Sequence, residues 1–390
     1  MSATRLPSMD RARFEVAFAP EHDSVRSTVK KLCDKFISPL VEEAERSATF
    51  PVELFPALGA AGYLCARIPA DRGGPDMDKI SECIISEEMM YVNRGIGTSV
   101  FAHSHLGTFP ISAFGTPEQR DRFLAPAING DRIAAFALTE PEAGSDVQSI
   151  RTSAHKCDGG WRLKGSKMYT TNGTIADFVI VAAYVDREKG YDGIGLFIVE
   201  AGSEGLTRVK LDKEGSRSSD TAQLFFEDTF VPDDCVLTTE GGFRLLMKTL
   251  DEGRVTVAAG AVGLARRAFE AALDYAATRE AFGQPIGRFQ VIGHQLATLA
   301  TEIDAARLMV YRAATLVDRG APFSAEASMA KVYATEVAVR TAVAARHIYG
   351  GAGELPDALV GRFLRDAQNL TVGEGTSEIQ RNIIAKGLGL

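Results

Sequence analysis

The spacing of apolar residues changes twice along this chain of 390 residues. From about residue 22 to 130, and again after about 237, apolar side chains recur at helical spacing. Between these stretches, short apolar runs are separated by Gly, Asn and Asp, and no helical pattern intervenes. Strands in direct succession indicate an antiparallel sheet or barrel and not a parallel sheet with crossover helices. We therefore predict an α+β protein in the order helices, sheet, helices.

The expected elements divide the chain into three parts. Helices are predicted at 25–44, 51–62, 80–91 and 120–125, then at 243–278, 289–319, 323–347 and 376–387. Strands are predicted at 134–138, 161–164, 178–185, 195–199 and 221–226. A chain of this length exceeds one ordinary hydrophobic core, so we expect domains at 1–132, 133–236 and 237–390. The long, Ala-rich helices of the last part are typical of a helix bundle.

Charge and terminal sequence exclude several classes of protein. The net charge of −8 is spread along the chain, which argues against non-specific nucleic-acid binding. Residues 1–18 carry charges and no apolar core, so we expect no secretory signal. No run of eighteen apolar residues occurs, so we expect no membrane span.

Cysteine and histidine usage points away from metal sites and disulfides. The five cysteines stand singly, without a CxxC pair, at Cys33, Cys65, Cys83, Cys157 and Cys235. This usage favours a reducing compartment, and we expect the cytoplasm. His103 and His105 resemble a metal pair, but no carboxylate or thiolate stands at ligand spacing, so no metal is expected.

Two strands end in polar turns that could contact a flat heterocycle. The segment 136–146 reads FALTEPEAGSD, and the segment 164–173 reads KGSKMYTTNG. Each turn offers hydroxyls and backbone N–H groups at the end of a strand. Taken alone, the first pattern is more typical of an ordinary Asx-type turn and the second of an ordinary hairpin.

Together with later segments, these two turns resemble the acyl-CoA dehydrogenase family. The further segments are SSDT (218–221), FFEDTFVP (225–232), LDEGR (250–254), REAFG (279–283), FQ (289–290), YGG (349–351), RD (365–366) and EGTSEIQR (374–381). The resemblance covers nearly the whole chain in order. It implies an N-terminal helical domain, a middle β-barrel-like domain and a C-terminal four-helix bundle. It also implies FAD bound between the middle and C-terminal domains.

The resemblance implies a set of ligand-binding residues. Those expected to bind the cofactor are Phe136, Leu138, Thr139, Ser145, Tyr169, Thr171, Arg279, Phe282, Gln290, His347, Gly350, Gly351, Thr376 and Glu378. Those expected to bind substrate are Ser145, Asp251, Arg254, Gly373 and Gly375. Tyr169 stands where relatives usually carry Trp or Phe and should still stack on the flavin ring. In the family, the residues matching Arg279, Phe282 and Gln290 come from a neighbouring subunit, and the family suggests a homotetramer.

Glu374 matches the catalytic base of the family. The implied reaction is α,β-dehydrogenation, in which Glu374 removes the α-proton and a hydride passes from Cβ to flavin N5. Some relatives place the base just before the arginine that matches Arg254, but Gly253 stands there and cannot serve. The neighbouring Glu252 is out of register on the helix. Glu374 alone, as a helix N-terminal acid, could simply interact with the helix dipole.

Gly373 departs from the family, many of whose members carry an aromatic residue, commonly Tyr, just before the base. The missing ring should open space near the thioester, so we predict a branched, cyclic or otherwise bulky acyl group. The acyl group could be carried by CoA, which Arg254 favours, or by a carrier protein. An electron-transfer flavoprotein is the usual acceptor in the family. Alternative readings are a non-catalytic relative that binds flavin or nucleic acid, and an oxidase whose reduced flavin reacts with oxygen.

Overall fold

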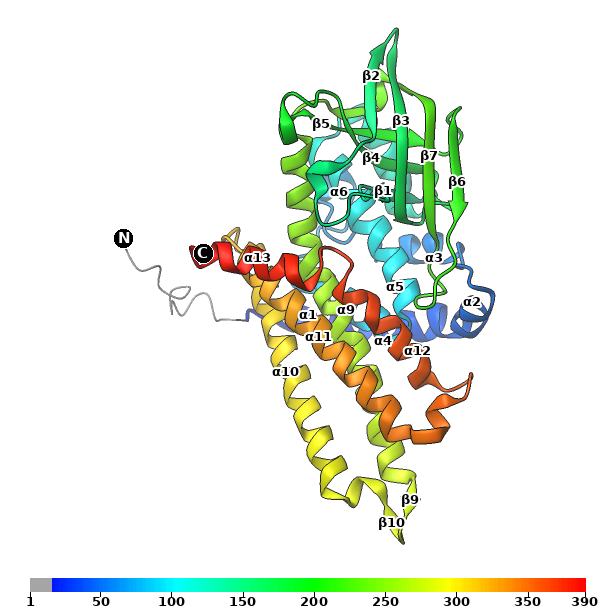
Figure 1. The fold of residues 1–390 in the computed structure, drawn as a ribbon, viewed down its shortest axis with the longest axis vertical. Helices are drawn as coiled ribbons and strands as arrows, with labels where there is room; N and C mark the ends of the chain where they lie inside the picture. The colour runs from blue at the N-terminus through cyan, green and yellow to red at the C-terminus, as the bar shows by residue number, and fades with distance from the viewer. Residues whose placement is uncertain (1–15) are drawn as a thin grey trace.

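The computed structural model describes residues 16–390, with helical parts on either side of a sheet (Figure 1). Our prediction of no secretory signal concerns mainly residues 1–15, which lie outside the described part. The α+β class and the order of the three parts are confirmed. Within residues 16–390 no helix is long and apolar enough to cross a bilayer.

The first part is a cluster of short helices. They are α1 (Pro20–Leu32), α2 (Val41–Ser47), α3 (Leu54–Ala60), α4 (Lys79–Val92), α5 (Arg94–Phe101), α6 (Phe109–Phe114), α7 (Pro117–Gln119) and α8 (Ala125–Asn129). The predicted helix at 25–44 is broken around Pro39, which lies in a tight 3₁₀ turn. Thr116 caps α7 as its sequence suggests, accepting a hydrogen bond from the Gln119 N–H at 3.2 Å.

The middle part is one sheet, and the sequence pattern predicted only some of its strands. Its strands are β1 (Ala134–Ala137), β2 (Ser153–Cys157), β3 (Gly160–Thr171), β4 (Phe178–Tyr184), β5 (Ile194–Glu200), β6 (Leu206–Lys210), β7 (Thr221–Pro232) and β8 (Val236–Thr238). Seven strands run in the order β6-β7-β3-β2-β4-β5-β8, and β1 pairs with β4. Most pairs are antiparallel, but β1 and β2 pair with β4 in parallel. The described sheet ends at β6 and β8, so the expected barrel does not close.

The last part contains the longest helices of the chain. They are α9 (Gly242–Thr278), α10 (Gln290–Asp318), α11 (Ser324–Tyr349), α12 (Leu359–Gln368) and α13 (Ser377–Gly387), with a small hairpin of β9 (Glu280–Ala281) and β10 (Gln284–Pro285). Helix α9 runs from the sheet to this hairpin, which forms the tip farthest from the sheet (Figure 1). Helix α11 packs against α9, α10, α12 and α13. Helix α4 of the first part also packs on α9 and joins the two helical layers.

A buried ion pair fixes the loop that follows β1. Lys167 Nζ on β3 donates to Glu140 Oε1 at 2.8 Å and to the Leu138 carbonyl at 2.8 Å. Glu140 also accepts from the N–H groups of Arg151 and Thr152. Burial lowers the pKa of Lys167 to about 8, against the opposing effect of the Glu140 carboxylate. Three segments of chain thus meet at one carboxylate, and the loop at 138–140 has a defined path.

We predict that Lys167→Met destabilises the folded chain by about 3–5 kcal/mol, because it leaves a buried carboxylate without its cation. The free energy of unfolding, measured by urea titration with excess FAD, tests this. Lys164→Met is the matched control, since Lys164 is exposed on the same strand and should change stability by no more than about 0.5 kcal/mol. Equal effects of the two substitutions would contradict the role of the pair.

Candidate active site

Glu374 lies in the loop between α12 and α13 with an unusual backbone conformation. Its φ is +58°, and the φ of Gly375 is +91°. Residues with a Cβ rarely adopt a positive φ, and such conformations are concentrated at functional sites. Thr376 ends the loop by accepting a hydrogen bond from the Ile379 N–H at 3.3 Å, which caps α13. The sequence pattern predicted the start of this helix but not the strained residue before it.

The carboxylate of Glu374 points into the protein. Although the residue as a whole is half-buried, its Oε2 atom is buried and has no hydrogen-bond partner among the described residues. Gly253 on α9 faces it, because a Cβ built at that position would lie 3.2 Å from Glu374 Oε2. The same point lies 3.3 Å from the Phe101 ring and 3.6 Å from the His105 ring. Position 253, where some relatives carry the base, is therefore directly opposite the base candidate of this chain.

Burial raises the pKa of Glu374 above that of an ordinary glutamate. Nearby basic residues oppose this effect, first Arg254, then His105, Lys331 and Lys79. Arg254 also approaches the backbone of Glu374, with its Nε 3.4 Å from the Glu374 carbonyl oxygen. The site therefore holds a carboxylate that binds a proton more readily than one in water.

His103 and His105 make separate contacts with the fold. His105 stacks between Phe101 and Phe109, with 5.5 Å between ring centroids on each side. Its Nε2 lies 3.0 Å from the Thr249 carbonyl, and its Nδ1 lies 3.3 Å from Glu82. His103 lies between the backbones of Ala127 and Ala134. Among residues 16–390 no group of three or more metal-ligating side chains gathers.

The two polar turns singled out in the sequence lie side by side. The Met168 N–H donates to the Thr139 carbonyl at 2.8 Å, which joins them. The pairing of β3 with β7 is irregular between Lys167 and Thr170, and Tyr169 within this bulge has a φ of +58°. As a result 65% of Tyr169 is exposed although it belongs to a strand.

The surface around Tyr169 fits a flat heteroaromatic group. Phe136, Thr139 and Thr171 are half-buried, Leu138 is buried, and Ser145 is exposed in its turn. An exposed ring held by a bulge can stack, and hydroxyls and N–H groups can hydrogen-bond acceptor atoms at the edge of a ring system. These residues could therefore hold an isoalloxazine ring.

Four of the five substrate-binding candidates, all except Ser145, form one connected group. Arg254 is buried and pairs with Asp251, which also accepts from the Ser324 hydroxyl at 2.6 Å. Arg254 is therefore held inside the chain by Asp251. Gly373 and Gly375 flank Glu374, and Glu378 is exposed in the first turn of α13.

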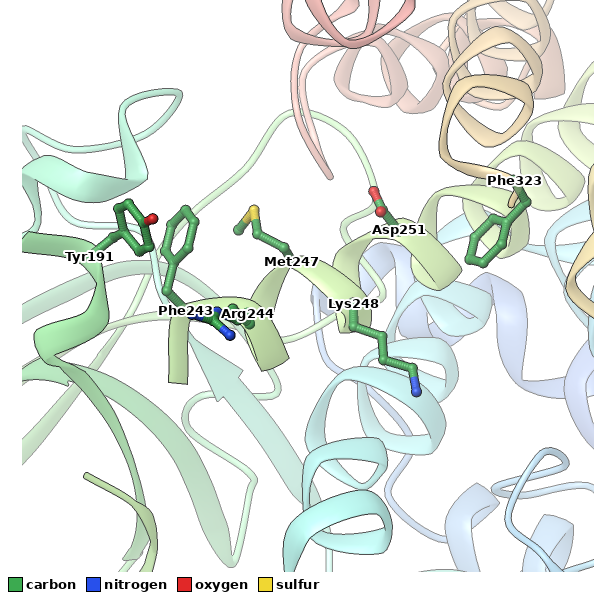
Figure 2. A pocket seen from close by; sticks show the side chains of 7 residues that line it. All are labelled: Tyr191, Phe243, Arg244, Met247, Lys248, Asp251 and Phe323. Atoms are coloured by element: carbon green, nitrogen blue, oxygen red, sulfur yellow. The ribbon is translucent and has the colours of Figure 1, made fainter. Parts of the chain in front are cut away.

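An open cavity of about 480 Å³ adjoins Asp251 (Figure 2). Its lining, of which the sequence pattern singled out only Asp251, consists of Tyr191, Phe243, Arg244, Met247, Lys248, Asp251 and Phe323. Most of these side chains come from successive turns of the first half of α9. Arg244 and Lys248 are exposed, whereas the aromatic residues and Met247 provide an apolar wall. Such a lining suits a long ligand with an apolar arm and phosphate groups.

The remaining cofactor candidates lie elsewhere in the chain. Arg279, Phe282 and Gln290 are exposed around the β9–β10 hairpin, and Phe282 is 96% exposed. His347, Gly350 and Gly351 are exposed at the C-terminal end of α11. Position 347 lies roughly 24 Å along α11 from Lys331, which contacts the Glu374 loop, at 1.5 Å per residue. A single chain therefore does not bring either group to Glu374.

Comparison with known proteins gives one consistent family. Residues 19–131, 135–229 and 240–389 match the N-terminal, middle and C-terminal domains of acyl-CoA dehydrogenases. An acyl-CoA dehydrogenase of Bacillus subtilis is 40% identical over 370 residues, which cover 94% of this chain and 98% of that protein.

Solved structures agree with the sequence comparison. The butyryl-CoA dehydrogenase of Megasphaera elsdenii has a TM-score of 0.92 and 36% identity, covering 96% of this chain and all of that one. The prolyl acyl carrier protein oxidase AnaB has a TM-score of 0.90 and 32% identity over 96% of this chain and all of its own. A relative at 28% identity was solved in complex with FADH2, and the cofactor of this chain is FAD. The chain belongs to the acyl-CoA dehydrogenase family, and it is an FAD-dependent oxidoreductase that acts on CH–CH groups.

Proposed function

We propose that the chain dehydrogenates an acyl thioester between Cα and Cβ, with Glu374 as the base. The observation that carries this proposal is the buried, unpartnered Oε2 of Glu374. The Cα–H next to a thioester carbonyl is weakly acidic, so its removal needs a carboxylate at close range. Burial favours the neutral form of Glu374, so the proton would be held at the carboxyl group after transfer. FAD, when bound, supplies the acceptor for the hydride from Cβ.

The backbone beside the base supports the same assignment. The N–H of Glu374 has no acceptor among residues 16–390. It would donate a hydrogen bond to the thioester carbonyl oxygen and stabilise the negative charge that grows there during proton removal. The carboxylate and the N–H belong to one residue, so fixing the loop fixes both groups at once.

The cavity beside Asp251 suggests how the thioester carrier is held. Tyr191, Phe243, Met247 and Phe323 would contact the pantetheine arm, and the exposed Arg244 and Lys248 would meet its phosphate groups. We propose CoA as the carrier. The second candidate is a carrier protein, which ends in the same arm and is favoured by the similarity to a carrier-protein oxidase.

We further propose that the FAD site is completed by a second subunit in a homotetramer. Arg279, Phe282 and Gln290 are exposed at the tip of the long helices, away from Glu374. A guanidinium such as that of Arg279 matches the oxygen atoms of a pyrophosphate. An electron-transfer flavoprotein, the usual acceptor in the family, would reoxidise the reduced cofactor.

We predict that Glu374→Gln lowers the rate of anaerobic flavin bleaching by an acyl-CoA by at least about 100-fold, the usual effect of losing a general base. The wild-type rate should rise with pH, because the carboxylate must be deprotonated. The midpoint should lie above about 4.3, since burial raises the pKa of this group. Stopped-flow absorbance at the flavin band across a pH series measures both effects.

Glu252→Gln is the matched control for this experiment. Glu252 is a buried acid next to Gly253 on α9, and its Oε2 faces Arg67 at 3.6 Å. This variant should retain bleaching. Wild-type bleaching in Glu374→Gln, or its loss only in Glu252→Gln, would reject Glu374 as the base.

We predict a preference for branched over linear short acyl thioesters, because Gly373 leaves room beside the base. A Cβ built at Gly373 meets only Asn369 atoms, at 3.7 Å, so its backbone tolerates a side chain. Gly373→Tyr should lower kcat/KM for isobutyryl-CoA by about 10-fold or more relative to butyryl-CoA. Steady-state assays of both thioesters, with Gly373→Ala as control, measure this ratio. The prediction would be contradicted if Gly373→Tyr left the ratio of the two kcat/KM values unchanged. It would also be contradicted if the wild-type enzyme preferred linear over branched acyl thioesters throughout.

We predict that two inactive variants restore activity when they share an oligomer. Arg279→Ala should weaken FAD binding by about 10-fold or more through loss of a charge-assisted bond. In a mixed oligomer with Glu374→Gln, one kind of site would contain both wild-type residues. Co-expressed, differently tagged chains assayed at low FAD should therefore regain activity that neither variant shows alone. Absence of recovery in verified mixed oligomers would place both residues in one subunit.

A further inference from the structure

The strained loop at Glu374 is held by hydrogen bonds to its carbonyl oxygens. Gln380 Nε2 donates to the carbonyl of Glu374 at 3.1 Å and to that of Gly375 at 3.0 Å. Lys331 Nζ donates to the Gly375 carbonyl at 2.7 Å. Arg254 Nε approaches the Glu374 carbonyl at 3.4 Å. The three donors come from α13, α11 and α9, so three separate helices fix two consecutive peptide groups.

The hydrogen bond to the Gly375 carbonyl is the only one that the Lys331 side chain makes within residues 16–390. This side chain is fully buried, and within residues 16–390 it forms no ion pair. Burial lowers the pKa of Lys331 to about 8, opposed first by the negative charge of Glu374. A buried ammonium group without a carboxylate partner is unfavourable, and hydrophobic side chains of similar size pack at less cost. Stability alone therefore does not account for a lysine at this position.

The contacts are also not needed to begin α13. Thr376 already caps that helix by accepting from the Ile379 N–H. Lys331 and Gln380 act one and two residues earlier, at the two residues with positive φ. Their contacts thus address the conformation of the loop rather than the end of the helix.

Hydrogen bonds that hold the Glu374 and Gly375 carbonyls also set the direction of the N–H group in each of the same peptide units. A peptide unit is planar, so a carbonyl held toward α11 and α13 turns its N–H the other way. The N–H groups of these two peptide units belong to Gly375 and Thr376. Neither has an acceptor among the described residues, so both face ligand or solvent. The same restraint limits the backbone rotation that would swing the Glu374 carboxylate away from Gly253.

We propose that Lys331 and Gln380 are positioning residues that hold the Glu374–Gly375 backbone in its reactive conformation. This inference rests on the proposed role of Glu374 as the base. Both side chains are fully buried, and they act through the two carbonyls they bind. Their effect is on the rate of proton removal and not on the binding of the thioester.

The test is Lys331→Met, which keeps the length of the side chain and removes the donor. We expect kcat to fall by about 10- to 100-fold, the cost of a small misplacement of a catalytic group, with little change in KM. The deuterium isotope effect with α-deuterated acyl-CoA should rise, because proton removal becomes more rate-limiting. Affinity for a non-oxidisable acyl-CoA thioether, measured by its effect on the flavin spectrum, should stay within about twofold of the wild-type value.

Two further variants keep the outcome decisive. Gln380→Met removes the other donor to the Gly375 carbonyl. It should also lower kcat, raise the isotope effect and leave KM nearly unchanged, so it can test the proposal even if Lys331→Met does not fold. The double variant should lose less than the product of the two single effects, since both act on one loop. Thr335→Val is the control, because buried Thr335 bonds only to its own helix and should alter stability without altering kcat or the isotope effect.

The inference is overturned if Lys331→Met and Gln380→Met lower the unfolding temperature but leave kcat and the isotope effect at wild-type values. That result would leave the proposed function intact, provided that Glu374→Gln remains inactive. An active Glu374→Gln enzyme would reject the proposed base itself, whatever the two positioning variants do.

Discussion

A carboxylate oxygen buried without a hydrogen-bond partner is unfavourable in a folded chain. Glu374 Oε2 is in this situation, and its surroundings are arranged around it. Gly253 supplies the room on α9, and Phe101 and His105 border the same space. The loop that carries the carboxylate adopts a positive φ at two consecutive residues. These features are consistent with a site whose contacts are completed by a ligand and not by the chain.

The two loops of the site are restrained in the same way. Lys167 donates to the Leu138 carbonyl beside the turn proposed to face the flavin, and Lys331 donates to the Gly375 carbonyl beside the proposed base. Burial lowers the pKa of each lysine to about 8. Buried ammonium groups contribute little net stability, because their desolvation offsets their attractions. Their common feature is that each fixes a backbone carbonyl next to a residue expected to touch the ligand.

The two lysines differ in how their charge is compensated. Lys167 has Glu140 as a direct partner, so removing either member leaves a buried charge. Lys331 has only the more distant charges of Glu374, Glu336 and Glu378 to offset that of Arg254. The first restraint is therefore strongly coupled to stability. The second is coupled to the ionisation of the Glu374 carboxylate, whose pKa it helps to limit.

Much of this arrangement could be predicted from the sequence, and the rest depends on tertiary contacts. The long helices at 242–278 and 290–318 have strong apolar periodicity and were predicted to within two residues. Helix α5 was missed because Gly95 and Gly97 weaken a helical pattern, although Gly97 is needed for close packing against Met90. Strand β6 was missed because it is largely exposed and has few apolar residues.

Within the site, too, local sequence segments could be predicted, whereas features that depend on tertiary contacts could not. Glu374 and the two polar turns lie in segments whose order along the chain carries the family resemblance. Lys331 lies inside a regular helix, and no local pattern distinguishes a buried lysine from an exposed one. The cavity beside Asp251 is likewise built from residues spaced along α9 that read as an ordinary amphipathic face.

The length of α9 bears on how many chains make one site. Arg254 lies beside the Glu374 loop, and Arg279 follows the last residue of the same helix. A continuous helix rises 1.5 Å per residue, which separates the two arginines by roughly 38 Å. The helix cannot fold back, and the hairpin after it exposes Phe282 almost completely. If both arginines contribute to one site, Arg254 toward the substrate and Arg279 toward FAD, the straight path of α9 favours their coming from different subunits, as in the proposed oligomer.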